Sequence, residues 1–168
     1  MGDEPVTDSQ VYRVGTHLLI IVGAFASFFA ALGIVIGVRR GDWTFLALVA
    51  GVAAALFLLL HVLRLEVRPD GFKYRNLSGS RQLLFRDVRR AYIEVVRADV
   101  APQGAGVFWV ERRDGRRVKV NLRTFPIQAA ASLFTALESH GIPIEVPDLW
   151  AARRLADQVR AEQERMRR

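Results

Sequence analysis

Two long apolar runs separated by four residues constrain this chain more than any other feature. The first covers residues 16–38 and the second residues 43–63, and neither contains Asp, Glu, Lys or Arg. A hydrocarbon core about 30 Å thick is crossed by about 20 helical residues, so each run is long enough to span a bilayer. Because the loop at residues 39–42 is so short, we expect an antiparallel transmembrane hairpin over residues 16–63.

A secretory signal and a buried hairpin of a soluble protein are the alternatives for these runs. The first run is long for the apolar part of a signal peptide, and the segment before it is acidic where a signal peptide is basic. The rest of the chain is too short to surround two such helices. The chain is also 51% hydrophobic, which is high for a soluble domain.

The basic residues on either side of the hairpin predict its orientation, because cytoplasmic loops carry an excess of Lys and Arg. The short loop has Arg39 and Arg40. The opposite side has more: Arg13, Arg64, Arg68, Lys73 and Arg75. We therefore predict a multi-pass membrane protein whose N-terminal segment (residues 1–15) and C-terminal part both lie in the cytoplasm.

Small residues recur at four-residue spacing in both runs, where they let helix backbones approach closely. They include Gly33 and Gly37 in the first run, and Ala47, Gly51 and Ala55 in the second. We expect them to pack the two spans together, with docking on other membrane subunits as the alternative. Neither run carries an acidic or basic side chain that could form a proton or ion path.

The pattern changes to that of β-structure at residue 64, directly after the second run. Apolar and polar residues alternate over several short segments, and Asp-Gly turns at residues 70–71 and 114–115 separate two pairs of them. Short turns predict antiparallel pairing. The predicted strands are residues 64–68, 72–76, 81–85, 90–97, 107–113 and 116–123.

Two helices are predicted after the strands. Pro126 is well placed in a first helical turn, an apolar stripe includes Phe134 and Leu137, and Gly141 marks the end. We assign residues 64–143 to one domain and residues 144–168 to a helical tail. The thin apolar stripe of the tail leaves three alternatives open: a solvated helix, a helix on anionic lipid, or a helix docked on a partner.

The order of these motifs resembles the bacterial pleckstrin-homology-like (PH-like) domain, which is often attached to a two-helix membrane hairpin. The motifs are "DGF" at residues 70–72, "FRDV" at residues 85–88 and the hairpin at residues 109–122. The resemblance implies an α+β fold: a partly open antiparallel β-barrel of six to seven strands, capped by one helix and used for binding. The turn at residues 69–71 is too short for the enclosing inositide pocket of eukaryotic relatives.

Catalytic and cofactor chemistry are not predicted. The chain has three His and no Cys, and these His residues are not at metal-ligand spacing. His140 is the one histidine outside the hairpin, so no Ser/His/Asp set can be assembled. We therefore expect neither an enzyme nor a cofactor. A nucleic-acid partner is also not expected, because the aromatic residues fall mostly in core register.

Basic residues close to the membrane exit are the candidate binding residues. Each basic side chain near an anionic leaflet contributes about 1 kcal/mol. A solvated face that only fixes the topology is the alternative. The residues expected to contact anionic lipid headgroups are Arg64, Arg68, Lys73, Arg75, Arg86, Arg89 and Arg90.

These features together predict a non-catalytic, membrane-anchored binding or scaffold protein. We expect it to be an accessory subunit or interaction partner of a larger membrane complex, with other integral membrane proteins or a second copy of the chain as partners. The alternative is a small transport component whose hairpin forms or regulates a translocation path. That alternative needs a polar lining, which the two runs lack.

Overall fold

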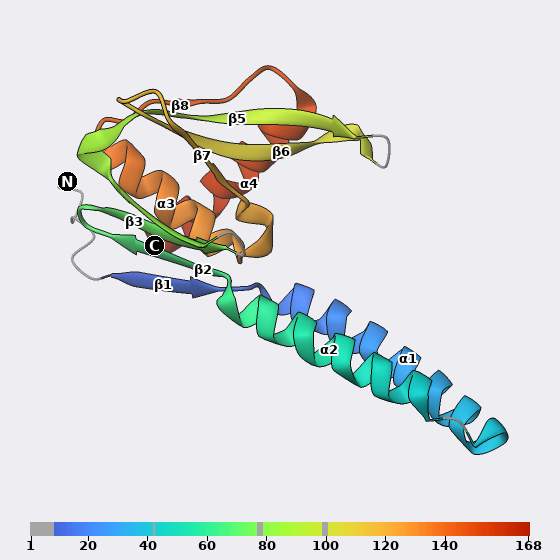
Figure 1. The fold of residues 1–168 in the computed structure, drawn as a ribbon. Coiled ribbons are helices and arrows are strands. Elements are labelled where there is room, and N and C mark those ends of the chain that lie inside the picture. Colours follow the sequence, from blue (N-terminus) through green and yellow to red (C-terminus); the bar gives the residue numbers. More distant parts are fainter. Residues whose placement is uncertain (1–8, 42, 77–78, 99–100) are drawn as a thin grey trace.

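Two helices leave the same end of a β-rich domain and run antiparallel to each other (Figure 1). The computed structural model describes residues 9–41, 43–76, 79–98 and 101–168. Helix α1 spans Thr16–Arg40 and helix α2 spans Thr44–Val62. At 1.5 Å per residue, they are about 37 Å and about 28 Å long. The predicted order, two long apolar helices followed by a β-rich domain, is confirmed.

The apolar side chains of both helices are largely uncovered by the rest of the chain. In the most apolar part of each helix, 6% of the residues of α1 and 0% of those of α2 are buried. Phe25, Phe28 and Leu58 are 63%, 66% and 68% exposed. A core helix of a soluble protein would bury most such side chains, so this exposure favours a membrane environment.

The first sheet has four antiparallel strands in the order β1-β2-β3-β4. Strand β1 differs from the prediction, which gives residues 1–15 no strand. It is fixed to the domain by Ser132, whose hydroxyl donates to the side-chain oxygen of Gln10 at 2.8 Å and also contacts the Tyr12 hydroxyl. The strands are β1 (Gln10–Arg13), β2 (Arg64–Arg68), β3 (Gly71–Asn76) and β4 (Gly79–Leu84).

The second sheet has the order β7-β6-β5-β8, in which β8 is parallel to β5 and the other pairs are antiparallel. A short 3₁₀ helix, η1 (Phe85–Asp87), leads from the first sheet into it. The Asp87 carbonyl accepts a hydrogen bond from the Arg113 amide at 2.8 Å. The strands are β5 (Val88–Ala98), β6 (Ala101–Arg112), β7 (Arg117–Val120) and β8 (Ile144–Glu145).

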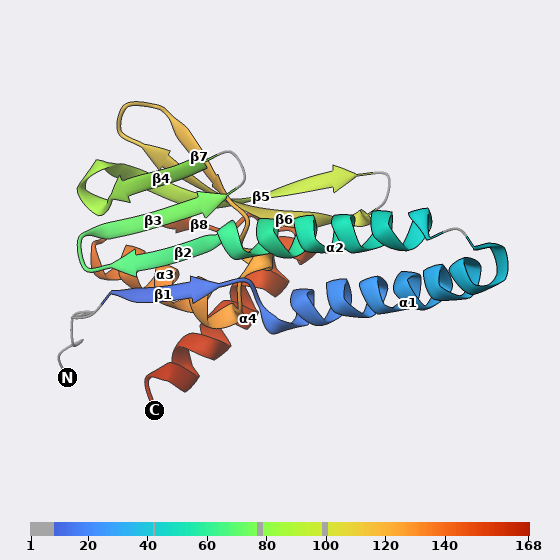
Figure 2. The same cartoon turned by 60° about the horizontal axis from the view of Figure 1, so that its bottom comes forward.

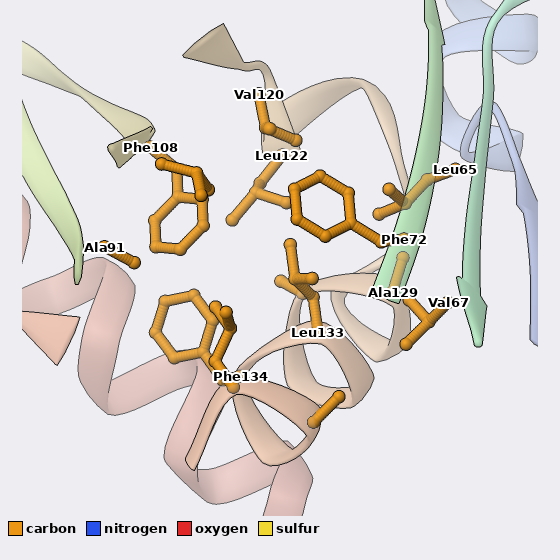
Figure 3. Packing of buried hydrophobic residues seen from close by; sticks show 14 of the residues in the cluster. Leu65, Val67, Phe72, Ala91, Phe108, Val120, Leu122, Ala129, Leu133 and Phe134 are labelled. Atoms are coloured by element: carbon orange, nitrogen blue, oxygen red, sulfur yellow. The ribbon is translucent and has the colours of Figure 1, made fainter. Parts of the chain in front are cut away.

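The predicted barrel is therefore corrected to two open sheets of four strands each, over the described parts of the chain. Helix α3 (Ile127–Ser139) lies between the sheets and separates them (Figure 1). Its Phe134 ring packs 5.0 Å from the Phe108 ring of β6, while its Leu133 points toward Phe72 of β3 (Figure 3). Apolar side chains from both sheets meet on one helix, so the sheets share a core without joining edge to edge.

Helix α4 (Trp150–Met166) packs against α3 on the side of the second sheet. Its Ala152, Ala156 and Val159 are buried in the same hydrophobic core. Gln163, also buried, donates hydrogen bonds to Thr135 at 3.0 Å and to Glu138 at 3.2 Å. Of the three alternatives for the tail, a fully solvated helix does not fit this packing, because the apolar stripe is used within the chain.

Candidate membrane-facing site

The hairpin joins the domain through two very short connections. Leu63 alone separates α2 from β2, and Val14 and Gly15 alone separate β1 from α1. The Gly15 amide donates a hydrogen bond to the Thr124 carbonyl at 2.9 Å, where Thr124 ends a 3₁₀ helix, η2 (Leu122–Thr124). The first sheet and η2 therefore both contact the base of the hairpin.

Three arginines form a row across the first sheet at this base. Arg13 of β1 is paired in register with Arg64 of β2, which is paired in register with Arg75 of β3. Figure 2 shows the ends of β1 and β3 and the start of β2 next to the helices. Their neighbours Tyr12, Leu65 and Tyr74 face the core, so the three arginines lie on the outer face of the sheet. We call them the arginine row.

Among the described residues, the arginine row has little compensating negative charge. Side chains directly opposite each other on neighbouring strands have Cβ atoms about 4.5–5.5 Å apart, and like charges at that spacing are destabilising. Arg64 has one carboxylate contact, to Glu66 at 3.9 Å. Within the described ranges, no carboxylate lies within 4.0 Å of Arg13 or Arg75. All three side chains belong to exposed residues.

The next part of the predicted set lies further from the hairpin. Lys73 lies two residues from Arg75 along β3, opposite Glu66 and Gln82. Arg68 ends β2, which at about 3.3 Å per residue is about 13 Å beyond Arg64, and its guanidinium contacts Glu66 at 2.7 Å. Arg86 lies in η1, at the opposite end of the domain from the helices (Figure 1).

Arg89 and Arg90 start the second sheet at that same far end and take part in an ion-pair network. Arg90 donates to Glu111 at 3.0 Å and to Glu145 at 3.1 Å, and Arg89 contacts Glu111 at 3.7 Å. The hydrogen bonds that Arg90 donates to Glu145 and then to Glu111 raise the pKa of Arg90 above its ordinary value. Because Glu111 is 6% exposed, Arg90 neutralises an otherwise buried charge and ties β8 to β6.

The small residues predicted to pack the hairpin differ between the two helices. Gly33 and Gly37 of α1 are buried, and a Cβ at either position would meet Leu46 at 3.2 Å or the Trp43 ring at 2.7 Å. Ala47, Gly51 and Ala55 of α2 are exposed, and nothing lies within 4 Å of a Cβ at Gly51. The α1 pair thus packs the hairpin, and this stripe of α2 does not.

Concave and metal-binding features are limited in the described part of the chain. A groove between α3, β8 and α4 is lined by apolar side chains such as Ile142, with Glu138 and Arg160 at its polar positions. No group of three or more His, Cys, Asp or Glu side chains in the described residues could hold a metal ion.

Comparisons of the chain with protein-family models, curated proteins and solved structures found no match. The resemblance to the bacterial PH-like domain therefore depends on the sequence motifs and the order of elements alone. What the structure adds is coarser: two long apolar helices, two open sheets, and helices packed between and beside them.

Proposed function

We propose that this chain is a non-catalytic binding module of the PH-like type, anchored in the bacterial inner membrane by α1 and α2 with both termini in the cytoplasm. The exposed apolar surface of the two helices supports the anchor. The basic residues around Arg64 support the orientation.

The observation that carries the proposal is the double connection between hairpin and domain. One residue links α2 to β2 and two link β1 to α1, with a hydrogen bond from Gly15 to Thr124. Such short connections are far below the length at which a linker behaves as a flexible chain. The function that follows is to hold a binding domain at a fixed height and orientation above the bilayer.

Two surfaces support a protein partner for the module. Strand β4 pairs only with β3 among the described strands, and Ser80, Arg81 and Gln82 on it are exposed, so its free edge could accept an extended peptide. The outward stripe of α2 at Gly51 offers close backbone approach to another transmembrane helix. Other integral membrane proteins, or a second copy of this chain, are the proposed partners.

A fluorescence-quenching experiment tests whether the domain is held at a fixed height and orientation above the bilayer. The chain has no Cys, so single cysteines can be introduced as Ser80→Cys near the hairpin and Arg116→Cys at the far turn, and each labelled with the same fluorophore. With a quencher attached to the lipid headgroups, a fixed domain gives strong quenching at position 80 and little at position 116. Equal quenching at both positions would show a freely moving domain and contradict the proposal.

In-cell cross-linking tests the binding role. A photo-reactive group at Gln82, on the exposed β4 edge, should attach reproducibly to one membrane protein, and the same group at Arg116 should not. A C-terminal reporter that is active only outside the cytoplasm would contradict the proposed orientation. Failure of every cross-link to yield a reproducible partner would contradict the binding role itself.

A further inference from the structure

The positive charge of the arginine row is only weakly compensated by carboxylates of the described residues. Register pairing places Arg13, Arg64 and Arg75 side by side, with one carboxylate contact at 3.9 Å among the described residues. Three adjacent guanidinium groups repel each other. A bound anion would reverse that effect, because charge-assisted hydrogen bonds to Arg are among the stronger ones in proteins.

We propose that the arginine row binds the phosphate groups of anionic phospholipids in the leaflet next to the domain, an inference that rests on the proposed membrane anchor. The planar guanidinium matches phosphate oxygens with two parallel donors, which a lysine cannot do. Three such groups in a line fit the phosphates of a bilayer surface. Their outward direction leaves them open to that surface.

The place of the row in the chain selects lipid as the source of phosphate. Arg13 precedes the start of α1 by three residues, and Arg64 follows the last residue of α2 by two. If the hairpin spans the hydrocarbon core, these positions lie at the headgroup level. Arg75 joins them only through its strand register with Arg64.

The arginine row contains fewer residues than the headgroup-contact set predicted from the sequence, and it includes Arg13, which that set lacks. The four predicted arginines outside the row lie further from the hairpin base: Arg68 ends β2, and Arg86, Arg89 and Arg90 lie at the far end of the domain. Arg13, in contrast, enters because β1 pairs with β2. The lipid site is therefore made by three strands at the hairpin base.

Native mass spectrometry of the full chain tests the proposal. The protein is released from mixed micelles with equal phosphatidylcholine and phosphatidylglycerol, and retained lipids are counted. We expect preferential retention of phosphatidylglycerol, decreasing about fivefold for each arginine removed in the series R75Q, R64Q/R75Q and R13Q/R64Q/R75Q. The matched control R86Q/R113Q/R116Q removes the same charge from exposed far-end positions and should keep the preference.

Three outcomes overturn the inference. Unchanged preference in the triple row variant would show that the row does not bind lipid, and an equal loss in the control would show a net-charge effect alone. Full competition by inorganic phosphate would show a site for free anions. If the triple variant does not fold, two measurements replace it. R75Q alone should lower the lipid preference, and added salt should weaken the preference of the wild type, because salt screens contacts between exposed charges. Absence of both effects would overturn the inference.

The anchor is tested separately from the row. Alkaline extraction of membranes that carry the full chain should leave the protein in the bilayer whether or not the row is substituted. Release of the wild-type chain would contradict the proposed anchor. Retention combined with no lipid preference would contradict the row alone.

Discussion

The two ends of the β-rich domain carry similar arginines in different surroundings. At the hairpin base, Arg13 and Arg75 have no carboxylate within 4.0 Å among the described residues, whereas at the far end Arg90 contacts both Glu111 and Glu145. A count of positive charges treats these ends alike. The difference is that the fold places two carboxylates beside Arg90 and, among the described residues, none within 4.0 Å of Arg13 or Arg75.

The largest expected effect tests whether the two ends belong to one folded body. Leu133 of α3 is fully buried between the two sheets (Figure 3). The substitution Leu133→Ala should lower the free energy of unfolding by about 2–5 kcal/mol through lost burial and a residual cavity. Thermal unfolding in detergent should remain a single transition. Separate transitions for the two sheets would break the comparison, because each end would then belong to its own unit.

A smaller effect on stability is expected from a substitution in the transmembrane hairpin, next to the end of the domain that carries the arginine row. A Cβ at Gly37 would lie 2.7 Å from the Trp43 ring, whereas nothing lies within 4 Å of one at Gly51. Gly37→Leu should therefore destabilise the packing of α1 on α2 by about 1–3 kcal/mol, seen as a red shift of Trp43 fluorescence. Gly51→Leu is the matched control, and an equal shift there would contradict the packing described.

At the far end, Arg90→Met should lower the unfolding midpoint, because it leaves the buried Glu111 without its closest cation. Anionic lipid should not restore it. The pKa of Arg90 is raised above its ordinary value, so its stabilising contribution is complete at neutral and mildly alkaline pH and is lost only as the pH rises through the folded-state pKa. The loss measured at pH 7 and pH 9 should therefore be equal. Arg86→Met, at an 81% exposed side chain, is the control and should change little.

The smallest expected effect sharpens the contrast most directly. In neutral detergent, Arg75→Gln should change the free energy of unfolding by less than about 0.5 kcal/mol, or raise it slightly as repulsion in the arginine row falls. In phosphatidylglycerol vesicles, the same substitution should remove part of the lipid-induced rise in the unfolding midpoint. A large destabilisation in neutral detergent would instead give Arg75 a structural role like that of Arg90.

Local patterns explain which parts of this fold are predictable. The hairpin is recognised from the uninterrupted apolar runs, and β2 and β3 from alternation around the Asp-Gly turn at residues 70–71. Strand β1 is not, because "QVYR" carries a weak signal and becomes a strand only by pairing with β2, more than 50 residues away. The barrel prediction is wrong because α3 packs between the two sheets and keeps their edges apart. That packing involves residues far apart in the chain, so strand patterns alone do not reveal it.

The candidate site shows the same limit. The sequence identifies Arg64 and Arg75 as basic residues near the membrane exit, but register adds Arg13 to them. The ion pair between Arg90 and Glu145 joins residues 55 positions apart through the parallel pairing of β5 and β8. Neither relation follows from spacing along the chain.

The sequence by itself determined two apolar helices, a direct transition to β-structure and the positions of the basic residues, because hydropathy and alternation are local properties. The tertiary structure decided that the strands form two open sheets and that α4 completes their core. It also decided which of the described arginines lie beside a described carboxylate. Pairing depends on distances between residues far apart in the chain, and those distances exist only once the sheets have packed around α3.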